Sequence, residues 1–113
     1  MRPFRRRGRV PPRQPHPDAR IEAELQRVIS LRRAVARKET LLDKDHRDIG
    51  VMRRKLRHDG ASGSAPMWAA HAEELQSEAA GLEAEIAKLH DEIAERISRL
   101  DDSDLAWLEG SPA

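Results

Sequence analysis

Apolar residues recur at every seventh position through the first half of the chain. They are Ile21, Val28, Val35, Leu42, Ile49 and Leu56. This spacing is typical of a long helix that buries one narrow stripe against another helix. A second apolar stripe follows a Gly/Ser segment and comprises Trp68, Leu75, Leu82, Ile86, Leu89, Ile93, Ile97 and Leu100. The pattern predicts an all-α protein in which two long antiparallel helices form a coiled-coil hairpin.

Capping and helix-breaking residues predict where these helices begin and end. Asp18 suits a helix N-terminus and Asp59-Gly60 suits a C-terminal stop, so the first helix is expected over 18–59. A loop is expected over 60–65, a second helix over 66–100, and a short terminal turn over 103–109 that begins at Ser103. Folding at the loop pairs residues whose numbers sum to roughly 126–130 and places Trp107 at the open end of the hairpin.

The segment before the first helix has a different composition. Residues 1–17 contain six Arg, five Pro and no acidic residue. Five prolines prevent a continuous helix, and the arginines repel one another. We therefore expect a disordered basic N-terminal tail over 1–17, followed by the helical hairpin over 18–109.

The formal net charge of +1 conceals a strong segregation of charge along the chain. Residues 1–20 carry a net +6, residues 21–59 a net +4, and residues 60–113 a net −9. A basic first helix beside an acidic second helix favours antiparallel pairing, either within one hairpin or between two chains. Exposed ion pairs contribute only about 0–1 kcal/mol each, so the charges bias the arrangement more than they stabilise it.

Several apolar residues remain after the main stripe has been assigned. Arg96 stands where the repeat of the second helix requires an apolar residue, and Ile97 takes its place. The residues that lie off the stripe and remain uncovered are Leu25, Ile29, Leu41, Leu105 and Leu108. The residues that we expect to form a protein interface are Leu25, Leu41, Ile97, Leu105 and Leu108. We expect these residues to bind a second copy, as a dimer that forms a four-helix bundle, or a helical protein partner.

The residues that usually carry chemistry form no recognisable site. The chain has no Cys, no nucleophile beside a base, and no Gly-rich phosphate loop. The segment around His46 lacks the glycine of a calcium loop, and His58 and His71 flank a flexible loop. We therefore expect no enzyme activity, no catalytic residues, no cofactor, no metal and no small-molecule substrate.

Hydropathy and composition also bear on location. No run approaches the ~18 apolar residues of a membrane span, and no apolar segment follows the N-terminal arginines to form a signal peptide. We expect no membrane association and a cytoplasmic location, which the absence of Cys fits.

These features together favour a non-enzymatic coiled-coil interaction protein, a scaffold or adaptor that self-associates or binds a helical partner. An alternative is a nucleic-acid- or ribosome-associated protein that uses its Arg-rich tail as an electrostatic arm. The residues of that alternative are Arg2, Arg5, Arg6, Arg7, Arg9 and Arg13.

The position of one Trp suggests a second alternative. Two long helices with Trp68 just after the bend resemble the Trp-x-Gly family of small secreted hairpins, although Ala70 stands where that family has Gly. Leu105 and Glu109 loosely match the aromatic-x-x-x-acid signal of that family. The resemblance covers the hairpin shape and one motif residue, and it implies a secreted or chaperone-type hairpin. A core plug beneath the turn explains Trp68 more simply.

Overall fold

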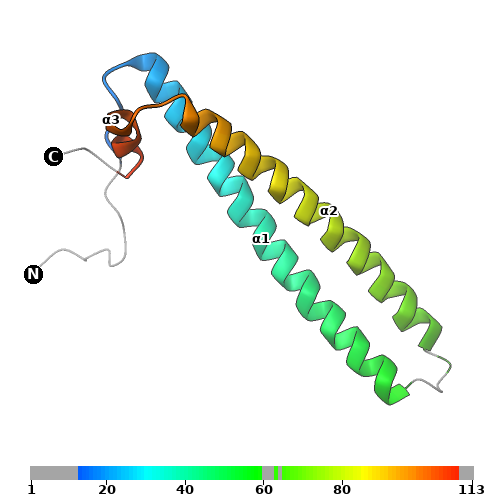
Figure 1. Ribbon diagram of the computed structural model, residues 1–113. Helices are drawn as coiled ribbons and strands as arrows, with labels where there is room; N and C mark the ends of the chain where they lie inside the picture. The colour runs from blue at the N-terminus through cyan, green and yellow to red at the C-terminus, as the bar shows by residue number, and fades with distance from the viewer. Residues whose placement is uncertain (1–12, 60–62, 64, 110–113) are drawn as a thin grey trace, which may run out of the picture.

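The chain folds as two long antiparallel helices with a short helical turn at their open end (Figure 1). The computed structural model describes residues 13–59, 63 and 65–109. Helix α1 spans Ala19–Asp59 and helix α2 spans Ala65–Ser98. The short helix α3 (Asp102–Leu105) and the 3-10 turn η1 (Ala106–Leu108) follow. The predicted all-α antiparallel hairpin is confirmed.

Local hydrogen bonds explain where the elements begin and end. Oδ1 of Asp18 accepts the backbone N–H of Arg20 at 2.9 Å, so Asp18 caps α1 as its sequence position indicated. Helix α2 ends two residues before the expected limit, because the N–H of Leu100 donates to the carbonyl of Ile97 at 3.0 Å in a tighter turn. Helix α3 is capped by Asp101 rather than Ser103, since the Asp101 side chain accepts the backbone N–H of Asp104 at 2.8 Å.

The register between α1 and α2 agrees with the expectation at mid-hairpin and departs from it toward the open end. The ion pair His46–Glu83 joins residues whose numbers sum to 129. The pairs Lys38–Glu85 and Arg27–Glu92 have sums of 123 and 119. Val28 packs in one buried cluster with Ile93, and Ile97, which is one of its expected partners, packs against the same cluster. The contacts at the open end are therefore shifted from the expected register by about one to two helical turns.

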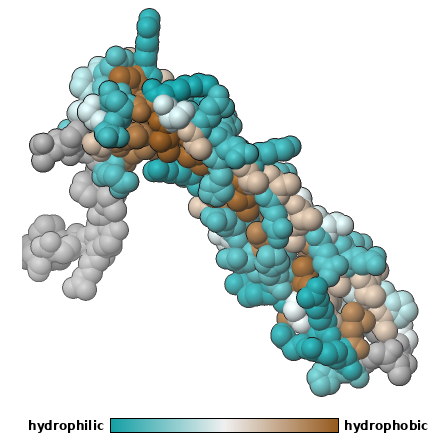
Figure 2. All heavy atoms as spheres, in the orientation of Figure 1, coloured by the Kyte–Doolittle hydropathy of each residue, from teal (hydrophilic) through white to brown (hydrophobic). Residues whose placement is uncertain are grey.

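The apolar core follows the seam between α1 and α2. Figure 2 shows the hydrophobic surface as a broad area near the open end that breaks into separate patches toward the loop. One buried cluster contains Val28, Leu31, Val35 and Ile93, and a second contains Ile49, Leu75 and Ala79. The hairpin thus has a packed open half and a thinner loop-proximal half.

Residues just before α1 have a defined position, although the sequence placed them in the disordered tail. The Arg13 side chain donates to the carbonyl oxygen of Trp107 at 3.0 Å, and His16 contacts Asp104 at 3.0 Å. These contacts hold the entering chain against α3 and η1 at the open end of the hairpin (Figure 1). The tail boundary therefore differs from the expected one: residues 13–17 are part of the folded body, and residues 1–12 lie outside the described residues.

Candidate interaction surface

The predicted interface residues do not form one surface in the hairpin. Leu25 has an exposed fraction of 0%, so its assignment as an uncovered residue is wrong for this fold. The physical reason is that Leu25 lies on the seam side of α1, one helical turn before Val28. Ile97 and Leu108 pack against the cluster at the open end, and Leu105 is half-buried. Of the five, Leu41 is the residue that is exposed, at 49%.

A polar clasp explains why the open end is covered. Glu22 accepts hydrogen bonds from Arg13 Nη2, from the backbone N–H of His16 at 2.8 Å, and from Gln26 Nε2 at 2.8 Å. Arg13 also binds the Trp107 carbonyl, so one guanidinium links the chain before α1 to the terminal turn. Chiefly because of the hydrogen bond from Arg13, the pKa of the Glu22 carboxyl is lowered to about 2.

His16 forms the second half of this clasp. Its Nδ1 accepts the backbone N–H of Asp18 at 2.9 Å, which assigns the proton of the neutral ring to Nε2. Nε2 lies 3.0 Å from Oδ1 of Asp104, and the ring meets Trp107 edge-on with 5.1 Å between the ring centroids. Sequence analysis placed Trp107 correctly at the open end but missed His16 and Arg13 as its partners, because both stand among prolines that predict disorder.

The loop-proximal half of the seam is less well filled. Small side chains, Ala72 and Ala79, occupy core positions on α2, and the carboxyl group of Asp45 occupies a core position on α1. Asp45 is only 5% exposed, and its Oδ2 has no hydrogen-bond partner among the described residues. A buried polar atom without a partner costs about 1–3 kcal/mol. The open half also contains one such atom, Arg13 Nε, but its seam is filled by larger apolar side chains.

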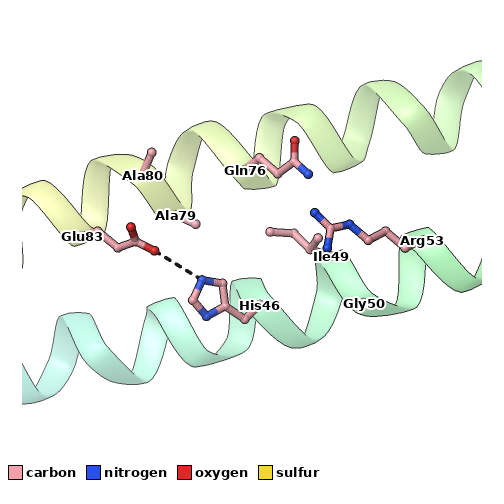
Figure 3. Close-up of a pocket in the computed structure, with 8 residues that line it drawn as sticks. All are labelled: His46, Ile49, Gly50, Arg53, Gln76, Ala79, Ala80 and Glu83. Atoms are coloured by element: carbon pink, nitrogen blue, oxygen red, sulfur yellow. Dashed lines mark ion pairs between the residues drawn. The ribbon is translucent and has the colours of Figure 1, made fainter.

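A groove lies between the helices in this weaker half. Figure 3 shows it as a hollow lined by His46, Ile49, Gly50, Arg53, Gln76, Ala79, Ala80 and Glu83. Its volume is about 430 Å³. The floor is formed by small and apolar residues; the α1 wall carries Arg53 at one end of the groove, and the α2 wall carries Glu83 at the other end. The ion pair between His46 Nε2 and Glu83 Oε1, at 3.5 Å, crosses one end.

A second, smaller hollow lies next to the loop. Met67, Trp68, Ala70, His71 and Glu74 line it, and its volume is about 390 Å³. Met67 is 61% exposed, whereas Trp68 is half-buried and has the Lys55 ammonium 4.7 Å from its ring centroid. This half-buried position is consistent with Trp68 as a plug beneath the turn.

Most of the predicted nucleic-acid contacts cannot be placed. Arg2, Arg5, Arg6, Arg7 and Arg9 lie outside the described residues. Arg13 is part-buried and bound to Glu22, so its guanidinium is engaged within the fold. The electrostatic-arm hypothesis therefore stays a prediction for the other five arginines.

The described part of the chain contains no helix that is long and apolar enough to cross a membrane. In the same residues, no three His, Cys, Asp or Glu side chains are grouped so that they could hold a metal ion. Comparison of the chain with known protein families, with curated proteins and with solved structures finds no match.

Proposed function

We propose that the protein is a non-enzymatic coiled-coil interaction protein, acting in the cytoplasm as a scaffold or adaptor, that self-associates through the groove between α1 and α2. The observation that carries this proposal is the groove itself, whose floor of Gly50, Ala79 and Ala80 leaves room for a further helix. Long helices owe most of their stability to tertiary burial. A second hairpin seated on this face supplies the burial that the loop-proximal half lacks.

Charge complementarity supports a second copy of this chain as the occupant. A two-fold axis parallel to the hairpin places α1 of each copy over α2 of the other, in antiparallel orientation. Glu83 of each copy then lies at the level of His46 of the other copy, because this axis preserves height along the helices. Arg53 lies on the opposite wall, seven residues or about 10 Å nearer the loop. The product is an up-down four-helix bundle in which every neighbouring pair of helices is antiparallel and opposite in charge.

The solution mass tests this proposal. Light scattering on the full-length protein is expected to give twice the chain mass of 12.8 kDa. Glu83→Arg or Arg53→Glu alone is expected to weaken the dimer about tenfold, because either change places like charges across the interface. The double variant is expected to recover much of the loss, since the swapped walls are again complementary.

A matched control separates this effect from a general change in charge. Asp91 is exposed on α2 and does not line the groove, so Asp91→Arg should leave the dimer constant within about twofold. A wild-type mass of 12.8 kDa at high protein concentration contradicts self-association. Equal weakening by Asp91→Arg and Glu83→Arg contradicts the assignment of the groove.

A further inference from the structure

We propose that the outer face of α1 is a binding site for the phosphate backbone of nucleic acid. Five cations define this cationic ridge: Arg33, Arg37, Lys44, Arg47 and Arg54. All five are exposed, and they lie in two columns of α1 with seven-residue spacing, one through Arg33, Arg47 and Arg54 and the other through Arg37 and Lys44. Between positions 26 and 58 the other residues of these columns are not acidic: Gln26, Ser30, Thr40, Val51 and His58. At about 1.5 Å per residue the ridge is about 32 Å long, close to one turn of a DNA duplex.

The helix geometry places this ridge away from the rest of the molecule. Three of the arginines stand five residues after a member of the first apolar stripe: Arg33 after Val28, Arg47 after Leu42 and Arg54 after Ile49. Five residues of an α-helix rotate the side chain to the side opposite the seam. The ridge therefore faces solvent beside, and not within, the proposed dimer groove. The inference does not depend on self-association.

The positive charge of the ridge is compensated in part, by Asp48 beside Lys44 and Arg47. Lys44 pairs with Asp48 at 2.7 Å, but within the described part of the chain no carboxylate forms an ion pair with any of the four arginines. A guanidinium presents a planar fork of donors that matches phosphate oxygens. Four guanidinium groups in these two columns bind phosphate oxygens and contact no base, so the binding does not depend on the nucleotide sequence.

The acidic helix α2 initially argues against such a site, because it would repel a polyanion. The structure places α2 on the far side of α1, and its acids nearest the seam, Glu85 and Glu92, are engaged by Lys38 and Arg27. Two helices, each about 10–12 Å across, separate the outer acids from the ridge by about 20 Å. This exceeds the Debye length of about 8 Å at physiological salt. The two opposite potentials are therefore screened from one another.

The same surface fits a membrane less well. Binding to an anionic bilayer requires large apolar side chains that enter it beside the cations. Leu41 and Met67 are the large apolar side chains that are exposed among the described residues, and neither lies in the ridge columns. A rigid, straight, polar ridge suits a nucleic acid backbone.

Fluorescence anisotropy with a labelled duplex of about 20 base pairs, titrated with the full chain from about 50 to about 200 mM salt, tests the site. The variant Arg33→Glu/Arg37→Glu/Arg47→Glu is expected to weaken binding at least tenfold and to reduce the salt slope by about 2–3. The control Arg20→Glu/Lys88→Glu/Arg99→Glu changes three exposed cations away from the ridge by the same total charge. It should weaken binding less than threefold.

A third protein separates the ridge from the basic tail. In this protein the tail arginines are replaced by Ser in the full chain: Arg2, Arg5, Arg6, Arg7 and Arg9. Adding the three ridge substitutions to this tail-substituted chain must still weaken binding. Loss of all binding in the tail-substituted chain, or equal effects of the ridge and control variants, overturns the proposal. So does a wild-type chain that does not bind the duplex at about 50 mM salt. Tighter binding to phosphatidylserine vesicles than to the duplex, with the same dependence on the ridge, also overturns it in favour of a membrane surface.

If circular dichroism shows that the charge-reversal variant has lost helicity, a charge-neutral variant is used in its place. This variant is Arg33→Gln/Arg37→Gln/Arg47→Gln. Glutamine is a good helix former and introduces no repulsion with neighbouring acids. A reduction of the salt slope without a change in helicity then carries the same conclusion.

Discussion

The half of the hairpin next to the chain termini and the half next to the loop share one seven-residue spacing, yet they pack differently. In the open half, Leu25 and Val28 are fully buried and branched aliphatic side chains meet across the seam. In the loop-proximal half, Ala72 and Ala79 face a column that contains the buried Asp45. The spacing of a stripe sets which residues meet, and the volume and polarity of those residues set how much stability results.

The two halves also differ in how their ends are held. The Arg13–Glu22 and His16–Asp104 contacts, together with Trp107, close the open end. Next to the loop, the Lys55 ammonium lies over the Trp68 ring, beyond the small cluster of Ile49, Leu75 and Ala79. We therefore expect the open half to be the stable half and the loop-proximal half to be the one that adapts to a partner.

The largest expected effect comes from removing core volume in the open half. Leu25→Ala should lower the free energy of unfolding by about 3 kcal/mol, because it leaves a cavity at a fully buried position. Leu75→Ala, in the cluster next to the groove, should cost about 2 kcal/mol, since Leu75 keeps 8% of its surface exposed and packs against the small side chain of Ala79. Urea unfolding followed by circular dichroism measures both. Equal losses would mean that the two halves are packed alike.

In the loop-proximal half, one substitution is expected to increase stability. Asp45→Leu should raise the free energy of unfolding by about 2 kcal/mol, because it replaces a buried carboxylate that has an unsatisfied oxygen with an apolar side chain. The exposed neighbour Asp43 provides the control, since Asp43→Leu should change stability by less than about 0.5 kcal/mol. A loss of stability in Asp45→Leu would show that the carboxylate is satisfied in solution.

The smallest expected effect concerns the clasp and its dependence on pH. The pKa of Glu22 is lowered from 4.5 to about 2 in the folded protein, so its contribution to stability is present above pH 4.5. This contribution is lost as the pH falls from 4.5 towards 2, where the folded-state carboxyl takes up its proton. Glu22→Gln should remove about 1 kcal/mol at neutral pH and flatten the acid limb of the stability profile.

Trp fluorescence during urea unfolding at several pH values measures this dependence, because Trp107 lies beside the clasp. Glu39→Gln is the matched control, since Glu39 is exposed and its carboxylate forms no ion pair among the described residues. An acid limb that is the same in Glu22→Gln and in the wild type would assign the pH dependence to other carboxylates.

Much of the fold was predictable from the sequence, for identifiable reasons. The stripe from Ile21 to Leu56 and its counterpart in α2 predicted two antiparallel helices, because a narrow apolar stripe is stable only when another stripe covers it. Asp18 and Asp59 stand within a residue of the observed limits of α1. Helix limits of this kind are encoded by residues adjacent in the chain, and sequence analysis can identify them.

The candidate sites were less predictable. The burial of Leu25 and the partnering of Arg13 depend on contacts between the two ends of the hairpin, which are more than eighty residues apart in the case of Arg13 and Trp107. The groove at Gly50 brings small residues of both helices together, Gly50 of α1 with Ala79 and Ala80 of α2. Its hollow shape required the positions of the walls at Arg53 and Glu83.

The sequence by itself determined the secondary structure, the antiparallel pairing and the segregation of charge, because periodicity, capping and charge are local properties of the chain. The tertiary structure alone decided the register at the open end and the clasp around Trp107. It also decided that the cationic ridge and the acidic helix face opposite directions. These properties depend on distances between residues far apart in the chain, and screening makes such distances decisive for electrostatics.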